Sequence, residues 1–482
     1  ALAAYETAGT GSTSDGKAYT GDTVNITGTA IGTFNNKNVN TATQVAFSGL
    51  SLTGAQASNY SLTIQSPVQQ SITPKALSMS GLTSLNKTYD GTTSASVGGT
   101  PVLASAETAG SGATNDGKAY LGDAVSITGT AVGTFNSKDV SSATSVTFSG
   151  LTLTGNEATN YSLTMQAAAS QRITPKALSM SGLSSTDKIY DGTTLATVTG
   201  TPMLSSFITA GSGSTSDGKA YTGDVVEISG TAVGTFSSKD VSAVANTVSF
   251  SGLNLIGPQS SNYSLTIQTP VAQHITPKAL TMNGLSVANK TYDASLGATL
   301  IGTAVLQGAE SAGSGTTGDG KPYTGDVVTI SGTPMGVFNS KDVSTATTVS
   351  VSGLNLGGAA SANYSLTPYP TISHGITAKT VSLSANKVYD ATTNLAGAVS
   401  ISTGVGSEVL SYVNATASDA HVATANKYIS AITLTNATGS GVGLASNYQL
   451  PTLDAAHAGV TITAATITPT LINTGITKIY DG

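Results

Sequence analysis

Residues 173–194 read Ile-Thr-Pro-Lys-Ala-Leu-Ser-Met-Ser-Gly-Leu-Ser-Ser-Thr-Asp-Lys-Ile-Tyr-Asp-Gly-Thr-Thr, and variants of this stretch return along the chain. Its Lys-x-Tyr-Asp core recurs roughly every 100 residues, starting at Lys87, Lys188, Lys290, Lys387 and Lys478. A second marker, Asn-Tyr-Ser-Leu or Asn-Tyr-Gln-Leu, starts at Asn59, Asn160, Asn262, Asn363 and Asn447. A period of this length matches one small domain and is too long for one solenoid coil. The sequence therefore predicts a tandem array of domains.

The two markers divide the chain into units of unequal completeness. Residues 1–75 match residues 102–176, a full unit without its opening segment, and the last residues match only the start of a unit. The predicted units are a truncated β repeat unit lacking its first strands (1–75), three full β repeat units (76–176, 177–278 and 279–379), a shorter divergent β repeat unit (380–469) and the first strand of a further unit (470–482).

The composition favours strands over helices. Only 9% of the residues are charged, against about 25% in typical domains, and Ser, Thr, Asn and 55 glycines supply the polar surface instead. Gly, Thr, Ser and Asn disfavour helix, whereas Thr, Val, Ile and Tyr suit strands. Apolar and polar residues alternate over 77–80, 125–128 and 161–165, and this period of two predicts strands with one buried face.

The turn signals complete the prediction of the fold. Asp116-Gly117, Gly129 and Gly150 punctuate the strands as turns or bulges. About seven short strands in about 100 residues predict an all-β tandem array of antiparallel β-sandwich domains of immunoglobulin-like type, and a β-grasp arrangement is the alternative. Prolines such as Pro74 and Pro175 stiffen the short linkers, so we expect the domains to stack end to end.

Several classes of function are disfavoured by composition. The absence of cysteine excludes disulfides, thiolate metal sites and a cysteine nucleophile. A net charge of −6 with Arg172 as the only arginine argues against a nucleic-acid partner. No apolar run approaches the ~20 residues of a membrane span, so membrane insertion is not expected. No cofactor is expected, and no nucleophile, base and orienting residue recur together, which argues against an enzyme.

The repeated stretch carries a resemblance to a known family. The pattern Ile-Thr-Pro-Lys-Ala-Leu followed by Lys-x-Tyr-Asp-Gly-Thr-Thr, with Asn-Tyr-Ser-Leu near the end of each unit, resembles the YDG-type repeat domains of giant bacterial surface adhesins, the filamentous-haemagglutinin-like large exoproteins. Two copies depart from the pattern, because Ala294 and Ala391 replace the glycine. The resemblance implies an extracellular stalk or filament at the bacterial cell surface, used in adhesion and biofilm, without enzymatic activity.

Three recurring residues suggest a covalent hypothesis. In some Gram-positive pilin and adhesin sandwiches, a lysine of the first strand bonds to an asparagine of the last strand with the help of a buried acid. Lys87 lies early in its unit, Asn160 lies late, and Asp90 would be the acid. The simpler interpretation is a solvated Lys87 beside an Asp90-Gly91 turn, and we favour it because long charged side chains are seldom buried.

Two weaker hypotheses concern metal and ligand binding. Asp116, Asp123 and Asp139 recur in register, and their oxygens would suit calcium, but no EF-hand loop surrounds them and aspartates in Asp-Gly turns usually bind their own backbone. In the loop 109–123, Lys118 and Tyr120 are candidates for ligand contact. Copies of this loop at regular spacing would bind surface glycans or matrix multivalently.

The expected function is a non-catalytic structural stalk or filament segment of a bacterial extracellular adhesin, which provides reach, cohesion and attachment to a surface or biofilm. The alternative is a multivalent glycan- or surface-binding array. Two assemblies stay open. In the favoured one the chain is an excerpt of a giant polypeptide and its partners are neighbouring repeats. In the other, copies polymerise by donor-strand complementation between the C-terminal strand and the open first domain.

Overall fold

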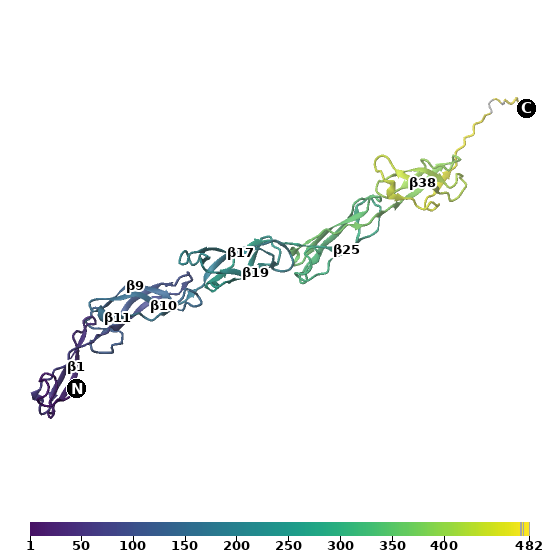
Figure 1. Cartoon of the computed structure of the whole chain (residues 1–482). Helices are drawn as coiled ribbons and strands as arrows, with labels where there is room; N and C mark the ends of the chain where they lie inside the picture. Colours follow the sequence, from purple (N-terminus) through teal and green to yellow (C-terminus); the bar gives the residue numbers. More distant parts are fainter. Residues whose placement is uncertain (473–474, 476, 482) are drawn as a thin grey trace. The chain divides into compact units, whose positions relative to one another are not determined.

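The computed structural model describes residues 1–472, 475 and 477–481, and it is built of strands joined by turns (Figure 1). The described part of the chain contains short 3-10 turns but no α-helix, and no helix in it could cross a membrane. The chain divides into two compact units. The first comprises 1–184, 200–232 and 250–269, and the second comprises 185–199, 233–249 and the residues from 270 onward. The all-β tandem architecture predicted from the sequence is confirmed.

We call the sequence units 1–75, 76–176, 177–278, 279–379 and 380–469 the first to fifth repeats. The first contains β1 (Asn25–Phe34), β2 (Gln44–Thr53) and β3 (Val68–Gln69). The second spans β4 (Lys75–Ser84), β5 (Lys87–Thr88), β6 (Ser94–Ala95), β7 (Val97–Glu107), β8 (Lys118–Tyr120), β9 (Ser126–Phe135), β10 (Ser145–Thr154), β11 (Tyr161–Thr164), β12 (Ala169–Ser170) and β13 (Ile173–Thr174).

The third spans β14 (Lys176–Ser185), β15 (Lys188–Ile189), β16 (Leu195–Ala196), β17 (Val198–Ile208), β18 (Lys219–Tyr221), β19 (Glu227–Phe236), β20 (Asn246–Ile256), β21 (Tyr263–Thr266), β22 (Val271–Gln273) and β23 (Ile275–Thr276). The fourth spans β24 (Lys278–Leu280), β25 (Met282–Val287), β26 (Lys290–Thr291), β27 (Gly297–Ala298), β28 (Leu300–Leu306), β29 (Thr329–Phe338), β30 (Thr348–Gly357), β31 (Tyr364–Leu366), β32 (Ile372–Ser373) and β33 (Ile376–Thr377).

The fifth contains β34 (Lys379–Thr380), β35 (Ser382–Val388), β36 (Val399–Ser402), β37 (Leu410–Ala417), β38 (Ile429–Asn436), β39 (Tyr448–Gln449) and β40 (Val460–Thr463). A 3-10 turn ends at the asparagine of each second marker: η1 (Ala57–Asn59), η2 (Ala158–Asn160), η3 (Ser260–Asn262), η4 (Ser361–Asn363) and η5 (Ala445–Asn447). The predicted further strand at 470–482 falls partly on residues outside the described ones, and those described there form no strand in this chain.

The second repeat, in the first unit, shows the topology best. Two four-stranded sheets have the orders β12-β10-β9-β6 and β11-β4-β7-β8, and β13 pairs with β5. The β9–β10 hairpin and the pair of β4 with β7 are antiparallel, as predicted. Three pairings differ from the prediction, because β4 with β11, β5 with β13 and β7 with β8 are parallel. Alternation defines which face of a strand is buried but leaves the direction of its neighbour open.

Paired glycines place a bulge in each long hairpin. In β9–β10 the register shifts between Ser149 and Leu151, and both Gly129 and Gly150 have positive φ, +104° and +80°. A Cβ on Gly150 would lie 2.3 Å from the Thr130 carbonyl oxygen. Glycine is therefore required here both for the backbone conformation and for the close approach of the two strands. The sequence predicted turns or bulges at Gly129 and Gly150, and the structure has a bulge there.

The buried side chains continue from one repeat into the next. In the first unit, one cluster joins Met79 and Val146 of the second repeat to Tyr221 and Tyr263 of the third. In the second unit, another cluster runs from the fourth repeat into the fifth, and it includes Tyr292, Leu395 and Tyr448. In these two pairs, each repeat is therefore packed against its neighbour as well as against its own sheets.

Candidate functional site: the joints between repeats

The repeated Lys-x-Tyr-Asp motif folds into a tight turn closed by its lysine. Lys87 Nζ donates hydrogen bonds to Asp90 Oδ1 at 2.6 Å, to the Thr92 carbonyl at 2.9 Å and to the Ser94 carbonyl at 2.8 Å. Asp90 Oδ1 also accepts the N–H of Thr92 at 2.9 Å, which is an Asx turn. Lys188 makes the same contacts in the third repeat. The lysine thus satisfies carbonyl groups that the turn leaves unpaired, and it fixes the tyrosine between them.

The motif tyrosine projects into the following repeat. Tyr89 is 0% exposed, and its ring contacts the rings of Tyr221 and Tyr263 edge-on at centroid distances of 5.7 and 5.3 Å. Its hydroxyl donates to Asp224 Oδ2 at 2.9 Å, and the Tyr263 hydroxyl donates to the same oxygen at 2.6 Å. A buried tyrosine needs a partner for its hydroxyl, and here the next repeat supplies it. We call each such contact between consecutive repeats a joint.

The second unit contains two more joints of the same design. The Tyr190 hydroxyl donates to Asp326 Oδ2 at 2.8 Å, and the Tyr292 hydroxyl donates to Glu408 Oε1 at 2.8 Å. The shorter fifth repeat therefore replaces the aspartate by a glutamate, whose second oxygen accepts the Tyr448 hydroxyl at 2.7 Å. The carboxylate is retained although the surrounding loop differs.

The asparagine of the second marker makes a second contact across each joint. Asn262 Oδ1 accepts the N–H of Val140 at 2.8 Å, and its Nδ2 donates to Asp139 Oδ1 at 2.8 Å. The equivalent bonds to the backbone recur at 2.8 to 2.9 Å: Val39 with Asn160, Val241 with Asn363 and Val343 with Asn447. Both sequence markers of the repeat thus meet at the same place.

The glycine of the motif allows the next repeat to approach. Gly91 has a φ of +77°, and a Cβ there would lie 2.7 Å from the Ala210 Cβ of the third repeat. Beside it, the Asp90 carbonyl accepts the N–H of Gly211 at 2.8 Å. Gly192 faces Ala312 of the fourth repeat in the same way. The fifth repeat lacks this Ala-Gly loop, and Ala294 occupies the glycine position of the motif that faces it, at a φ of +62°.

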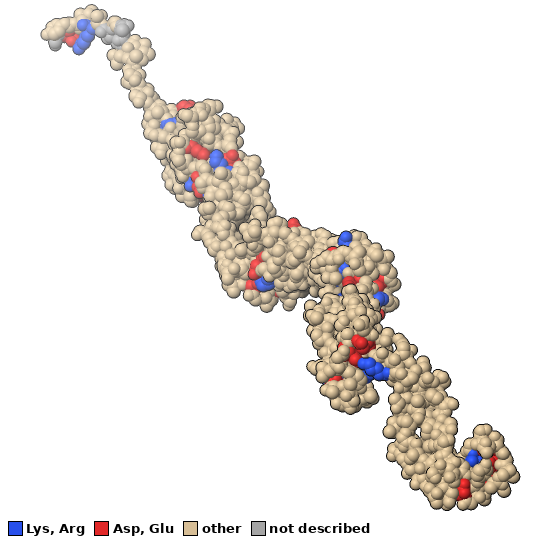
Figure 2. Space-filling view, turned by 90° about the vertical axis from the view of Figure 1, so that its left-hand side faces the viewer, with Lys and Arg blue, Asp and Glu red and all other residues tan. Residues whose placement is uncertain are grey.

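Burial and the neighbouring carboxylate keep the Tyr89 hydroxyl of the joint protonated. Burial and the hydrogen bond to Asp224 together raise the pKa of Tyr89 to about 12. Lys138 Nζ lies 3.3 Å from the Tyr89 hydroxyl and 3.8 Å from Asp224 Oδ1, so it balances the carboxylate. Figure 2 shows the same pattern on one face of the molecule, where acidic and basic atoms lie side by side in a few small groups.

A largely buried lysine that sequence reasoning missed directly precedes each full repeat, as the first residue of that repeat's first strand. Lys75 Nζ contacts Glu107 Oε1 at 2.5 Å and Asp116 Oδ1 at 3.0 Å, and it lies over the Tyr120 ring at 4.2 Å. Burial lowers the pKa of Lys75, but the bonds to the two carboxylates outweigh burial and raise it above its ordinary value. The alternation Lys-Ala-Leu-Ser-Met places Lys75 on the same face as Leu77, which is the signal that could have revealed it.

The residues of the covalent hypothesis do not all meet. Lys87 and Asp90 form the ion pair of the turn at 2.6 Å. Asn160 instead makes its hydrogen bonds to Asn38 and Val39 of the first repeat. Asn160 and Lys87 therefore belong to different joints, and the structure does not bring them together.

The calcium candidates are also held by separate partners. Asp116 pairs with Lys75, Asp123 accepts the Tyr161 hydroxyl at 2.6 Å, and Asp139 is bound by Lys138 and by Asn262. The described ranges contain no group of three or more histidine or acidic side chains arranged to hold a metal ion. The three aspartates serve as hydrogen-bond acceptors of the fold and the joints.

The proposed ligand loop is divided between solvent and packing. Lys118 is exposed, whereas Tyr120 is half-buried and its N–H donates to the Tyr161 hydroxyl at 3.0 Å. The equivalents of Tyr120 in the next two repeats, Tyr221 and Tyr323, are buried in joints at 1% and 2% exposure. Among these residues Lys118 therefore remains the more accessible one for a ligand.

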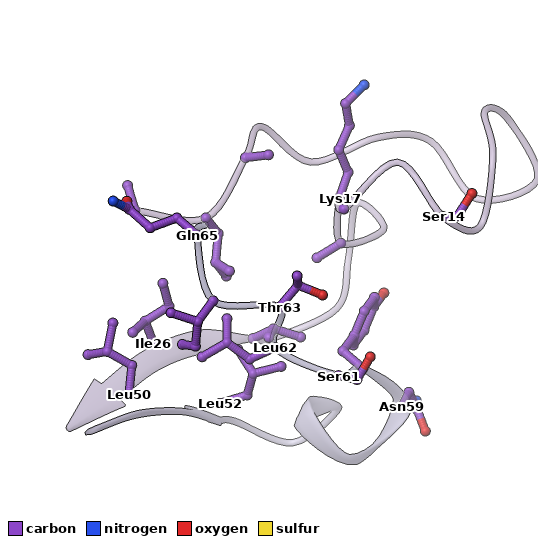
Figure 3. A pocket seen from close by; sticks show the side chains of 18 of the residues that line it. Ser14, Lys17, Ile26, Leu50, Leu52, Asn59, Ser61, Leu62, Thr63 and Gln65 are labelled. Atoms are coloured by element: carbon purple, nitrogen blue, oxygen red, sulfur yellow. The ribbon is translucent and has the colours of Figure 1, made fainter. Parts of the chain in front are cut away.

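The first repeat contains an open cavity of about 910 Å³ (Figure 3). Leu50, Leu52 and Ile26 line its apolar side, and Lys17 and Ser14 lie on the loop opposite. The second repeat fills the equivalent position with β4, whose Leu77 packs against Tyr161, Leu153 and neighbouring residues. This arrangement does not test donor-strand complementation, which stays a prediction.

Comparison with known proteins identifies the repeats. The model of the YDG domain matches residues 3–68, 73–170, 174–271 and 276–372. The fifth repeat, which has Ala391 in place of the glycine and lacks the Ala-Gly loop, lies outside these matches. A search of curated proteins and a search of solved structures found no match. The four matched segments make up most of the chain, which therefore belongs to the YDG domain family.

Proposed function

We propose that this chain is a non-catalytic, load-bearing stalk segment of a giant bacterial surface adhesin, exposed outside the cell and active in attachment and biofilm cohesion. Its partners would be neighbouring repeats of the same polypeptide. Each repeat would be an immunoglobulin-like sandwich built from its two sheets, since side chains of both sheets, such as Leu82 and Leu151, share one core.

The observation that carries the proposal is the pairing of entry and exit strands beside each joint. In the second repeat β5, near the entry of the chain, runs parallel to β13, near its exit. The Tyr89 N–H donates to the Thr174 carbonyl at 2.8 Å. The same parallel pairing recurs as β15–β23, β26–β33 and β35–β40. When the two ends of a repeat are pulled apart, parallel terminal strands must slide past each other, so their hydrogen bonds break together rather than one after another.

The joint residues would carry the same load from one repeat to the next. Tyr89 is attached to the β5–β13 pair in one repeat and is bonded to Asp224 in the next. Force that arrives at this strand pair would thus pass directly into the neighbouring core. A chain that served only to display separate binding loops would have no need for this coupling.

Stretching single molecules of the full chain between its termini tests the load-bearing role. We expect a series of separate unfolding events at high force, one for each folded repeat. Exchanging Lys87, Lys188 and Lys290 for methionine should lower these forces, because it releases the turns beside the terminal strands. The control is Lys118→Ala, on an exposed loop. Smooth extension of the wild-type chain at low force would refute the proposal.

The location of the chain at the cell surface is tested separately from its load-bearing role. Antibodies against the chain should label intact, unpermeabilised cells of the source bacterium. Labelling that requires permeabilisation would overturn the surface assignment. The multivalent glycan-binding alternative stays a prediction, and Lys118→Ala combined with Lys17→Ala in a glycan-binding assay would examine its accessible residues.

A further inference from the structure

The buried lysine clusters of the second and fourth repeats have the composition of a site that could form a covalent bond. Lys75 Nζ lies within 3.0 Å of oxygens of both Glu107 and Asp116. Lys278 is 0% exposed and lies 2.7 Å from Glu310 Oε1 and 2.9 Å from Asp319 Oδ1. Each cluster therefore contains one amine, one carboxyl group to receive it and a second carboxyl group beside them.

The backbone orients the carboxyl group of Asp116 toward the lysine. Its Oδ1 accepts the N–H of Lys118 at 3.0 Å. This hydrogen bond polarises the Cγ–Oδ1 bond and makes Cγ more open to attack by the amine. Its Oδ2 faces Glu107 Oε2 across the space left by Gly112, where a Cβ would lie 3.0 Å from Oδ2 and closer still to Oε2. Asp319 and Glu310 are oriented identically about Gly315, with the Lys321 N–H as donor.

The third repeat provides a natural comparison within the same chain. Lys176 is 0% exposed and lies 2.8 Å from Asp217 Oδ1, and Asp217 Oδ1 accepts the N–H of Lys219 at 2.9 Å. Ile208 takes the place of the glutamate, and its Cδ1 occupies the space beside Gly213. Lys176 Nζ makes no hydrogen bond of good geometry in the described part of the chain. The amine and its carboxyl partner are thus retained, and the second carboxyl group is absent.

We propose that Lys75 and Asp116, and likewise Lys278 and Asp319, join by an intramolecular isopeptide bond, with Glu107 and Glu310 transferring the proton. This modification goes beyond the stalk function and does not depend on it. The third repeat, without its glutamate, keeps the ion pair.

The reaction is a condensation that releases one water molecule. Asp116 takes up one proton from solvent and the ammonium group of Lys75 passes one proton to Glu107, so that the amine and both carboxyl groups are neutral. Burial favours this neutral form, and the ion pairs of Lys75 with the two carboxylates oppose it. The Nζ lone pair then attacks Cγ of the protonated Asp116, whose Oδ1 is held by the Lys118 N–H. A C–N bond forms, the C–Oδ2 bond breaks, and Glu107 gives its proton to the leaving hydroxyl. No oxidant or reductant is required. Glu107 takes up the remaining amine proton and releases it to solvent, which returns the glutamate to its carboxylate form and balances the proton that Asp116 took up.

The bond would strengthen the repeat where the chain enters it. Lys75 begins β4, directly after the linker residue Pro74. A covalent link from Lys75 to Asp116 closes residues 76–115 into a loop that a pulling force cannot extend. The effect resembles that of a disulfide in a chain that contains no cysteine.

The intact mass of the full chain tests the proposal. The wild-type chain should be lighter than its sequence mass by about 36 Da, because each bond releases about 18 Da of water. Glu107→Gln and Glu107→Ile should each restore about 18 Da, and Ile208→Glu should remove a further 18 Da or so. Lys75→Met with Lys278→Met should restore the full sequence mass.

Peptide mapping separates the isopeptide bond from the one reaction that mimics its mass. Asp116-Gly117 can lose water within a single peptide by cyclising to a succinimide. The proposal requires one branched peptide that contains both Lys75 and Asp116, and it requires the link to survive mild alkali. A wild-type chain at its full sequence mass, or a loss confined to a linear peptide, would overturn it. If Ile208→Glu impairs folding, the isosteric Glu107→Gln variant still decides the role of the glutamate.

Discussion

At the scale of single residues, the third position of the Tyr-Asp-Gly motif is determined by the neighbouring repeat. Gly91 and Gly192 face an Ala-Gly loop whose alanine leaves no space for a Cβ. Ala294 faces the fifth repeat, which has no such loop, and there the residue keeps a positive φ as alanine. Steric contact with the Ala-Gly loop explains the glycine at positions 91 and 192. Where that loop is missing, the contact is missing too, and alanine is tolerated at position 294.

Replacing Ala294 by glycine should therefore stabilise the fourth repeat. Alanine at a φ of +62° costs roughly 1–2 kcal/mol, and the greater freedom of glycine in the unfolded chain offsets part of this gain, so we expect about 1 kcal/mol. The measurement is the urea concentration at which the fourth repeat becomes susceptible to protease. Ala309→Gly, in an exposed segment without positive φ, is the control and should not raise it.

The hydroxyl of Tyr89 should make the joint sensitive to alkali. Its pKa is raised to about 12 from an ordinary value of about 10, so the folded state retains the proton more tightly than the unfolded state. The stabilisation is complete below pH 10 or so and is lost as the pH rises through 12. A difference titration of phenolate absorbance between wild type and Tyr89→Phe should show one group that ionises near pH 12. Ionisation of that group near pH 10 would contradict this assignment.

At the scale of strands, sequence alternation predicts the elements well and their partners poorly. The stretch 77–80 lies in β4, and the stretches 125–128 and 161–165 match β9 and β11 except for one residue each. The parallel pairs were missed, since alternation carries no direction. The joint was also missed, because Tyr89 and Asp224 are far apart in sequence and no local pattern links them. The two recurring sequence markers were the only available hint of the joint. They revealed the length of the repeat but not that the markers of consecutive repeats meet.

The bulge in the β9–β10 hairpin can be tested by restoring a side chain. Gly150→Ala should destabilise the second repeat by more than about 2 kcal/mol, because it adds a clash with the Thr130 carbonyl to the strain of positive φ. Gly122→Ala is the matched control. Gly122 has a φ of +94° with no atom near its missing Cβ, so that variant reports the strain alone. Equal losses of stability in the two variants would show that the contact with the Thr130 carbonyl adds no cost, which would contradict the prediction.

At the scale of the whole molecule, the sequence repeat and the contact between repeats have the same origin. The equivalents of Tyr89, Asp224 and Asn262 meet in the three joints that follow the second, third and fourth repeats, and the carboxylate is retained as Glu408 even where the loop around it has changed. The stability of each repeat should therefore depend on its neighbour, as in other tandem arrays.

Hydrogen exchange of the joint loops in the full chain tests this claim most directly. The N–H groups of Gly211 and Gly313 donate to carbonyls of the preceding repeat. Segments 209–213 and 311–315 should therefore exchange more slowly than 108–112, the equivalent loop of the second repeat, which has no motif tyrosine before it in this chain. Gly91→Asn keeps the positive φ accessible but adds a Cβ against Ala210.

In that variant we predict fast exchange at 209–213 and unchanged exchange at 311–315, and Gly192→Asn should give the reverse. Exchange at 209–213 that equals that at 108–112 in the wild-type chain would contradict the account. So would a Gly91→Asn variant whose second and third repeats stay folded and whose segment 209–213 exchanges as slowly as in the wild type.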